Sequence, residues 1–191
     1  MNRSEPHPVR WTRDEYFRMC EAGIFNDRRV ELIGGEIVEM AAQYDLHLAA
    51  IDLTAAALQV AFGPGFWIRR QGTLDLSPHG VPDPDLAVIP GGPTGAGRTV
   101  PTNALLVVEV SDSSLGYDRN RKGNLYAAAG IADYWIVNLV QRQLEIYRGP
   151  SADTAQPFGF GYSTRTILDP SDTTTLLAAP NALVAVAALL P

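Results

Sequence analysis

Two carboxylates beside apolar segments are the residues best suited to hold a cation. Asp85 opens the run DLAVI directly after Pro84, and Glu109 lies near the end of the run LLVVEV. Hard divalent cations bind carboxylate oxygens, and a bound cation polarises a phosphate and acidifies water. If the two runs are neighbouring strands, both side chains meet at one end of a sheet. A lone Asp after proline is also a common turn residue, whereas Glu109 in an apolar run requires a compensating cation or partner.

Lys122 is the single lysine of the chain, since 14 of the 15 basic residues are arginine. Its compact ammonium suits a position beside a reacting phosphate or water molecule. In the helix expected around it, Lys122 shares a face with Leu125, Tyr126 and Ala129, which predicts an inward side chain. The alternative is a surface lysine kept by chance.

Glu31 is a further candidate acid, between Val30 and Leu32 in a predicted strand. Period-two alternation puts it on the face of Ile33 rather than that of Leu32. It either completes the cation site or is an ordinary exposed acid of an edge strand, and both interpretations stay open at this point.

The elements that must position these residues alternate between helix and strand. Residues 12–22 predict a helix with Thr12 as N-cap, and RVELIGGEIVEM predicts a hairpin around Gly34 and Gly35. Residues 45–62 predict a long, largely apolar helix, and His47 on it is interpreted as a buried or edge histidine. Strands are expected at 66–71, 85–89, 105–110, 134–138 and 144–148, with a helix over 118–129 capped by Asp118.

This order predicts an α/β (α+β) fold in which helices flank a mixed central β-sheet. The unbroken runs at 85–89 and 105–110 are typical of central strands buried on both faces. We expect one domain over residues 1–191, with its core at about 12–148 and a peripheral, β-rich segment at 149–191. The Gly-rich segment 91–99 lacks a Gly-Lys-Ser/Thr ending, so it is interpreted as a connection between strands.

Composition narrows the class of protein. The net charge of −6 argues against a protein that coats nucleic acid through bulk positive charge, although bound metal ions would neutralise local acids. The single cysteine, Cys20, excludes an intramolecular disulfide and a cysteine metal cage. No run approaches the ~20 apolar residues of a membrane span, and the N-terminus lacks the apolar run of a signal peptide. We therefore expect a cytoplasmic protein without membrane contact.

Four motifs in a fixed order carry a family resemblance. The series VELIGGEI, PDPDLAVI, LLVVEVSDSS and DRNRKGNLYAAAGIADYWIVN resembles the bacterial putative restriction endonuclease family within the PD-(D/E)XK nuclease superfamily. The resemblance spans residues 12–148. Each motif is loose by itself, but a VEV strand followed by K-x-x-x-Y-x-x-x-G-x-x-x-Y-W is specific.

The resemblance implies a restriction-endonuclease-like core and Mg²⁺-dependent or Mn²⁺-dependent hydrolysis of DNA. It implies that Asp85 and Glu109 are metal ligands, that Glu31 is an additional acid of the metal site, and that Lys122 is the catalytic lysine. The simple superfamily motif has lysine two residues after the acid, where this chain has Ser111. The resembling family instead carries the lysine on the next helix.

The predicted function is therefore a metal-dependent endonuclease in which Lys122 orients the attacking water and stabilises developing charge. The alternatives are an inactive nucleic-acid or protein interaction module on the same fold, a small-molecule hydrolase, and a structural oligomer. Analogy with enzymes that cut both strands suggests a homodimer. Arg69, Arg70, Arg98, Arg119 and Arg121 could form a local phosphate-binding rim, but most surface arginines are simply solvated, which is the default interpretation here.

Overall fold

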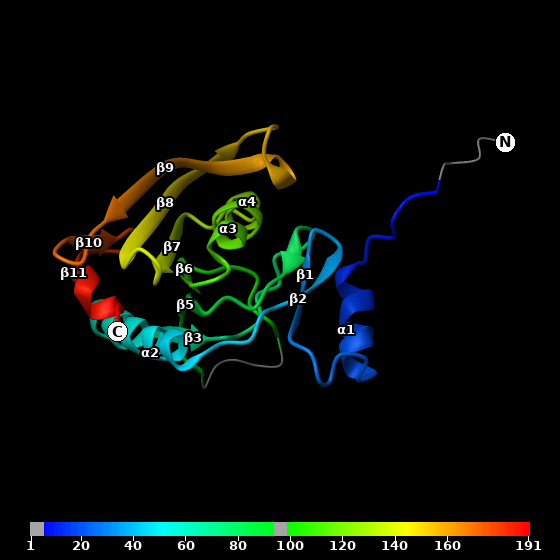
Figure 1. Cartoon of the computed structure of the whole chain (residues 1–191), viewed down its shortest axis with the longest axis horizontal. Helices are drawn as coiled ribbons and strands as arrows, with labels where there is room; N and C mark the ends of the chain where they lie inside the picture. The colour runs from blue at the N-terminus through cyan, green and yellow to red at the C-terminus, as the bar shows by residue number, and fades with distance from the viewer. Residues whose placement is uncertain (1–5, 94–98) are drawn as a thin grey trace.

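The computed structural model describes residues 6–93 and 99–191, and its centre is a six-stranded sheet (Figure 1). The strand order is β3-β5-β6-β7-β8-β9, in which β6 and β7 are parallel and all other neighbours are antiparallel. This mixed sheet, flanked by helices, confirms the predicted fold class. The strands are β3 (Phe66–Arg70), β5 (Leu86–Pro90), β6 (Leu106–Ser111), β7 (Asp133–Asn138), β8 (Gln143–Ala152) and β9 (Phe160–Leu168).

Helices cover both faces of the sheet (Figure 1). Helix α2 (Asp45–Phe62) packs on one face against β3 and β6, and it begins and ends where the sequence predicts. The other face carries one continuous helical segment, made of α3 (Leu115–Tyr117), a π-helical turn (Asp118–Lys122) and α4 (Gly123–Ala128). Helix α4 contacts β8 and β9, so the outer half of the sheet curves around it.

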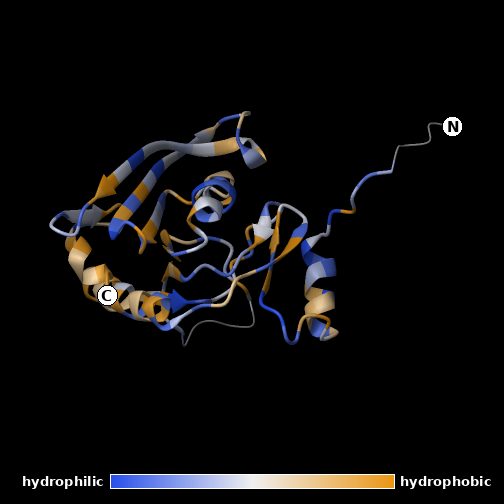
Figure 2. Cartoon of the chain, viewed as in Figure 1, coloured by the Kyte–Doolittle hydropathy of each residue, from blue (hydrophilic) through white to orange (hydrophobic). Residues whose placement is uncertain are grey.

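Of the described helices, α2 is long and apolar enough to cross a membrane, with 18 residues and a mean hydropathy of 1.3 (Figure 2). Core helices also meet these two criteria. Ala50, Ala55 and Leu58 of α2 are buried in the core between this helix and the sheet, whereas Leu53 and Val60 are exposed.

Successive side chains of the central strands point to opposite faces of the sheet, and each face has its own hydrophobic core. Val108 and Val110 pack on the α2 side of the sheet, while Val107 packs on the α4 side. Glu109 lies two residues from Val107, so its side chain points to the α4 side. Asp85 is likewise two residues from Ala87, which belongs to the α4-side core. Both predicted metal ligands thus face the helical segment that carries Lys122.

A smaller sheet stands beside the main one and has the order β2-β1-β4. It consists of β1 (Val30–Ile33), β2 (Glu36–Glu39) and β4 (Gly80–Val81). Gly34 and Gly35 join β1 to β2 with φ of 60° and 79°, values that glycine adopts without strain, and the predicted hairpin is confirmed. Helix α1 (Arg13–Glu21) has the predicted N-cap at Thr12 and packs its Tyr16 against this sheet.

The C-terminal segment differs from the predicted peripheral position. Strand β9 pairs with β8 as far as Ala152 and forms the edge of the main sheet. Beyond it, the hairpin of β10 (Thr173–Leu176) and β11 (Ala179–Ala185) leads into a 3₁₀ turn (Val186–Leu189). Val184 and Leu189 are buried in the α2-side core. The Pro and Gly residues here mark turns between packed strands rather than a loose tail.

Glu145 of β8 attaches the helical segment to the sheet. Arg119 of the π turn donates two hydrogen bonds to this buried carboxylate, at 2.5 and 3.0 Å, and Arg165 of β9 donates a third at 2.8 Å. Burial alone would raise the pKa of Glu145, but the hydrogen bonds from Arg119, Tyr147 and Asn138 lower it to about 2. The carboxylate therefore stabilises the segment on which Lys122 lies.

We predict that Glu145→Gln lowers the free energy of unfolding by roughly 3 kcal/mol at neutral pH. Because the pKa is lowered on folding, this stabilisation is complete above the ordinary glutamate pKa of 4.5 and is lost as the pH falls toward 2. Urea titrations of wild type and variant at a series of pH values measure the difference. The difference in free energy of unfolding between wild type and variant should narrow below pH 4.5. A difference that stays constant down to pH 3 would show that the pKa of Glu145 is not lowered by its hydrogen bonds. Glu39→Gln, which breaks an exposed pair with Arg28, is the control.

Candidate active site

The main-chain register brings the two predicted metal ligands face to face. Leu86 pairs with Val108, and continuing this antiparallel register by one residue sets Asp85 opposite Glu109. The Val110 N–H donates to Asp85 Oδ2 at 2.9 Å, and the Asp85 N–H donates to Glu109 Oε2 at 3.4 Å. Each carboxylate is therefore oriented by the backbone of the other strand.

Lys122 lies between two of the candidate acids. Its Nζ is 3.0 Å from Glu109 Oε1 and 3.2 Å from Glu31 Oε1. The lysine is 2% exposed and Glu31 is 0% exposed, so Lys122 points inward as predicted and Glu31 is not an exposed edge acid. The ammonium thus joins β6 of the main sheet to β1 of the smaller sheet.

A π-helical turn over Asp118–Lys122 replaces the regular first turn that the sequence predicts. The helical segment begins at Leu115, so the prediction of Asp118 as an N-cap is wrong. Asp118 is instead buried, and its Oδ2 accepts hydrogen bonds of 2.6 Å from the hydroxyls of Ser111 and Ser114. Such wide turns recur at functional sites, and this one directs both Asp118 and Lys122 inward.

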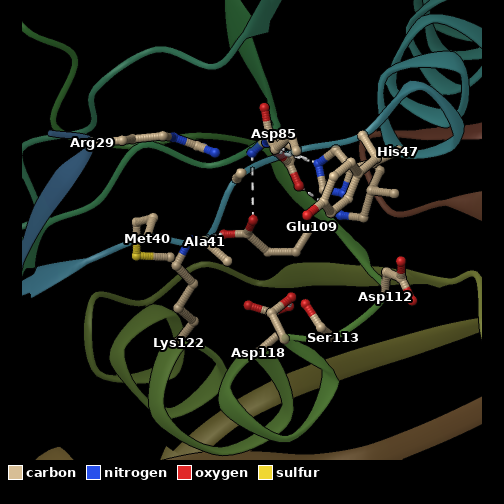
Figure 3. A pocket seen from close by; sticks show the side chains of 15 residues that line it. Arg29, Met40, Ala41, His47, Asp85, Glu109, Asp112, Ser113, Asp118 and Lys122 are labelled. Atoms are coloured by element: carbon tan, nitrogen blue, oxygen red, sulfur yellow. Dashed lines mark hydrogen bonds and ion pairs between the residues drawn. The ribbon is translucent and has the colours of Figure 1, made fainter. Parts of the chain in front are cut away.

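A cavity of about 60 Å³ opens beside these residues (Figure 3). This is several times the space that one bound water needs. Asp85, Glu109, Asp118 and Lys122 line it, and the exposed Asp112 extends it to the surface. Glu31 is not among its lining residues, which also include Arg29, Met40, Ala41, Ala42, Gln43, Tyr44, His47, Val110, Ser113 and Ser114. The cavity gives solvent access to an otherwise buried carboxylate pair.

His47 and Gln43 reach the site although the sequence assigned neither to it. His47 Nε2 is 3.2 Å from Asp85 Oδ1, and Gln43 Nε2 donates to the same oxygen at 3.0 Å. His47 lies on the packed face of α2, but at the first turn, where that face reaches the end of β5 (Figure 3). The sequence gives one indication of this position, because His47 lies one helical turn before Ile51, which is buried on the same face of α2. Gln71, which resembles a family position near the site, hydrogen-bonds to Gln43.

Tyr126 is a second contact that sequence reasoning did not assign. Its hydroxyl donates to Glu109 Oε1 at 2.6 Å, the same oxygen that contacts Lys122. Tyr126 follows Lys122 by one helical turn, so their shared face is visible in the sequence. The two donors hold one oxygen of Glu109, and among the described residues Oε2 has only its long contact to the Asp85 N–H.

The site contains more buried acid than buried base. Burial raises the pKa of Glu31 and Asp118 and raises that of Glu109 well above its ordinary value, although Lys122 opposes each shift. Burial also acts to raise the pKa of Asp85, but hydrogen bonding and attraction to His47, followed by the Val110 N–H, lower it. The ammonium of Lys122 is kept charged because nearby carboxylates outweigh its own burial. A divalent cation would balance the remaining negative charge.

The donor set fits a hard cation that keeps part of its hydration shell. Within residues 6–93 and 99–191, no three His, Cys, Asp or Glu side chains are arranged to hold a metal ion by themselves. Mg²⁺ is commonly bound through one or two carboxylates, with water and substrate phosphate as its other ligands. Asp85 and Glu109 supply such a pair. Glu31 does not line the cavity, and its Oε2 has no hydrogen-bond partner among the described residues, so its role as a metal ligand stays a prediction.

The described arginines considered for a phosphate-binding rim are engaged within the protein. Arg69 donates to the Thr73 carbonyl, and Arg98 lies outside the described residues. The other three members form ion pairs, namely Arg70 with Asp52, Arg119 with Glu145 and Arg121 with Glu36. These four described arginines are therefore not free to bind phosphate without breaking an internal contact.

Comparison with known proteins decides the family. The profile of Uma2, the putative restriction endonuclease family, matches residues 13–187. The chain belongs to this family. The match supports a nuclease-like function and confirms the resemblance seen in the motifs, and it extends through the C-terminal segment that completes the sheet and core. No curated protein matches the chain.

A solved structure shares the fold of this Uma2 protein. It is a putative nuclease from Anabaena variabilis, with a TM-score of 0.71 and 13% sequence identity. The match covers 95% of this chain and 97% of the other. At this identity the likeness concerns the fold alone, and it includes nearly the whole of both chains.

We predict that Lys122→Met destabilises the protein by about 3–5 kcal/mol, because two buried carboxylates lose their shared ammonium. A second change, Glu31→Gln, removes one of those charges and should recover part of the loss. Chemical denaturation of the single and double variants measures this coupling. Strictly additive effects would contradict a direct Lys122–Glu31 interaction, and Arg28→Met provides an exposed cation as control.

Proposed function

We propose that this protein is a divalent-metal-dependent endonuclease that hydrolyses DNA phosphodiesters. The observation that carries the proposal is the opposed pair Asp85 and Glu109 beside a surface-connected cavity, with Lys122 contacting Glu109. Membership of Uma2 supports the nuclease class. Family membership does not specify the metal or the substrate, and we propose a divalent metal ion as cofactor and DNA as substrate.

Asp85 and Glu109 are the proposed ligands of Mg²⁺ or Mn²⁺. When bound, the cation would polarise the phosphate and acidify a water molecule. His47, Gln43 and the Val110 N–H hold Asp85 in the orientation that faces Glu109. Because these donors come from a helix, a loop and the neighbouring strand, the carboxylate is oriented before any ligand enters.

Lys122 is the proposed catalytic lysine. Its ammonium has three N–H donors, and Glu31 and Glu109 accept two of them. The third is available to orient a water molecule or to stabilise negative charge that develops on the phosphate. Glu31 accepts one hydrogen bond from the ammonium while Glu109 accepts another, and we propose that positioning Lys122 is the contribution of Glu31 as the additional acid.

The substrate and the setting follow from the same proposal. A chain with net charge −6 repels DNA at long range, so binding depends on local neutralisation by cations at the carboxylate site. We propose a cytoplasmic enzyme, and a homodimer if both strands of a duplex are cut together. Gel filtration of the active protein tests the dimer.

We predict that wild type cleaves supercoiled and linear DNA with Mg²⁺ or Mn²⁺, and that Asp85→Asn and Lys122→Ala lower the rate by at least about 100-fold. Agarose gel assays with purified proteins measure this. Asp52→Asn is the matched control, because Asp52 is an exposed acid on α2 that forms an ion pair with the exposed Arg70, away from the candidate site. Equal rates in all four proteins would remove Asp85 and Lys122 from the site.

Calorimetric titration with Mn²⁺ tests the metal separately from cleavage. We predict a binding isotherm for wild type and a loss of affinity of at least about 10-fold in Glu109→Gln. Folding of the variant is checked by circular dichroism. Binding that is unchanged in Glu109→Gln would place the cation elsewhere, and an absence of binding to wild type would count against a metal enzyme.

A further inference from the structure

Arg29 differs from the other arginines around the candidate active site. Its side chain lines the carboxylate cavity, and within the described residues it makes no hydrogen bond or ion pair. The neighbouring Arg28 instead donates to Glu39 at 2.6 and 3.0 Å on the exposed surface. Two adjacent arginines therefore face different surroundings, and only Arg29 is directed to the cavity.

A backbone hydrogen bond holds the main chain of Arg29 at the base of the β1–β2 hairpin. The residue directly precedes β1, and its carbonyl accepts a hydrogen bond of 2.8 Å from the N–H of Met40, which follows β2. The base of the hairpin is thereby closed at the wall of the cavity. Figure 3 shows the Arg29 side chain extending toward Asp85, with His47 on the other side of that acid.

Asp85 and Glu109, which line the cavity together with Arg29, are engaged by other groups, and Glu31 is attracted to Arg29 but forms no hydrogen bond with it in the described residues. Asp85 accepts from Gln43, His47 and the Val110 N–H, and Glu109 accepts from Lys122 and Tyr126. The half-buried guanidinium of Arg29 thus keeps its donors toward the cavity. A guanidinium has five N–H donors in a planar fork, which matches two oxygens of a phosphate.

We infer that Arg29 binds a non-bridging oxygen of the DNA phosphate that enters this cavity. The inference rests on the proposed function, because the phosphate would lie between the cation at Asp85 and Glu109 and the guanidinium. A phosphodiester has two non-bridging oxygens, so one can face the cation while the other accepts from Arg29. Positive groups on both sides fix the orientation of the phosphate relative to Lys122.

The test compares wild type with Arg29→Ala, Arg29→Lys and the neighbouring Arg28→Ala. Binding of a short, fluorescently labelled DNA duplex is measured by anisotropy over a range of NaCl concentrations with Ca²⁺ as a hard divalent cation that also takes oxygen ligands, and cleavage is measured with Mn²⁺. We expect Arg29→Ala to weaken binding roughly tenfold and to reduce the slope of log K against log salt by about 1, as for one lost phosphate contact. Arg29→Lys should keep the slope, and Arg28→Ala should match wild type in both measurements.

The possible results separate a failure of the Arg29 inference from a failure of the proposed nuclease function. If wild type binds and cleaves DNA but Arg29→Ala and Arg28→Ala behave alike, Arg29 is not a phosphate ligand and the proposed function stands. If wild type neither binds nor cleaves DNA, the proposed function fails and the inference fails with it. Thermal unfolding checks for a structural effect, since Arg29→Ala removes no side-chain hydrogen bond of the described residues and should unfold at the temperature of wild type.

Discussion

The buried ammonium of Lys122 is the interaction on which the arrangement of the site depends. Removing an ammonium from water is costly unless carboxylates accept its hydrogen bonds, and Glu31 and Glu109 do so. These three residues come from the smaller sheet, the π turn and the main sheet. The two sheets and the helical segment must therefore converge correctly for this charge to be tolerated, which couples the packing of the domain to the geometry of its site.

The topology of the sheet explains why these groups meet. The antiparallel pairing of β5 with β6 sets Asp85 opposite Glu109. The parallel pairing of β6 with β7 requires a crossover connection, and this crossover is the helical segment that carries Lys122. This segment crosses the face of the sheet to which Glu109 points. The change from antiparallel pairing at β5–β6 to parallel pairing at β6–β7 therefore brings Lys122 over Asp85 and Glu109. Ser111, at the position where the simple motif has lysine, holds Asp118 instead.

Features encoded by local sequence were predictable, and features that need distant contacts were not. The α2 helix and the Gly34-Gly35 hairpin follow from periodicity and turn chemistry, and Glu109 was identifiable because an acid in an apolar strand is unusual. The role of His47 depends on where α2 begins relative to β5, and the π turn is held against β8 through Arg119 and Glu145. The local sequence indicates that His47 faces inward but not that it reaches Asp85, and it does not indicate the π turn. The C-terminal strands were misplaced because frequent Pro and Gly obscure pairing between segments far apart in the chain.

The contribution of residues 184–189 to the α2-side core has a consequence for synthesis on the ribosome. Chains emerge N-terminus first, and domains generally fold as units. Helix α2 and the strands beneath it leave the ribosome before Val184, Val186 and Leu189, which complete their core. Nascent chains that have not yet reached β11 expose this apolar surface to chaperones and proteases. The α2-side core therefore closes only after β11 and the 3₁₀ turn that follows it have been made.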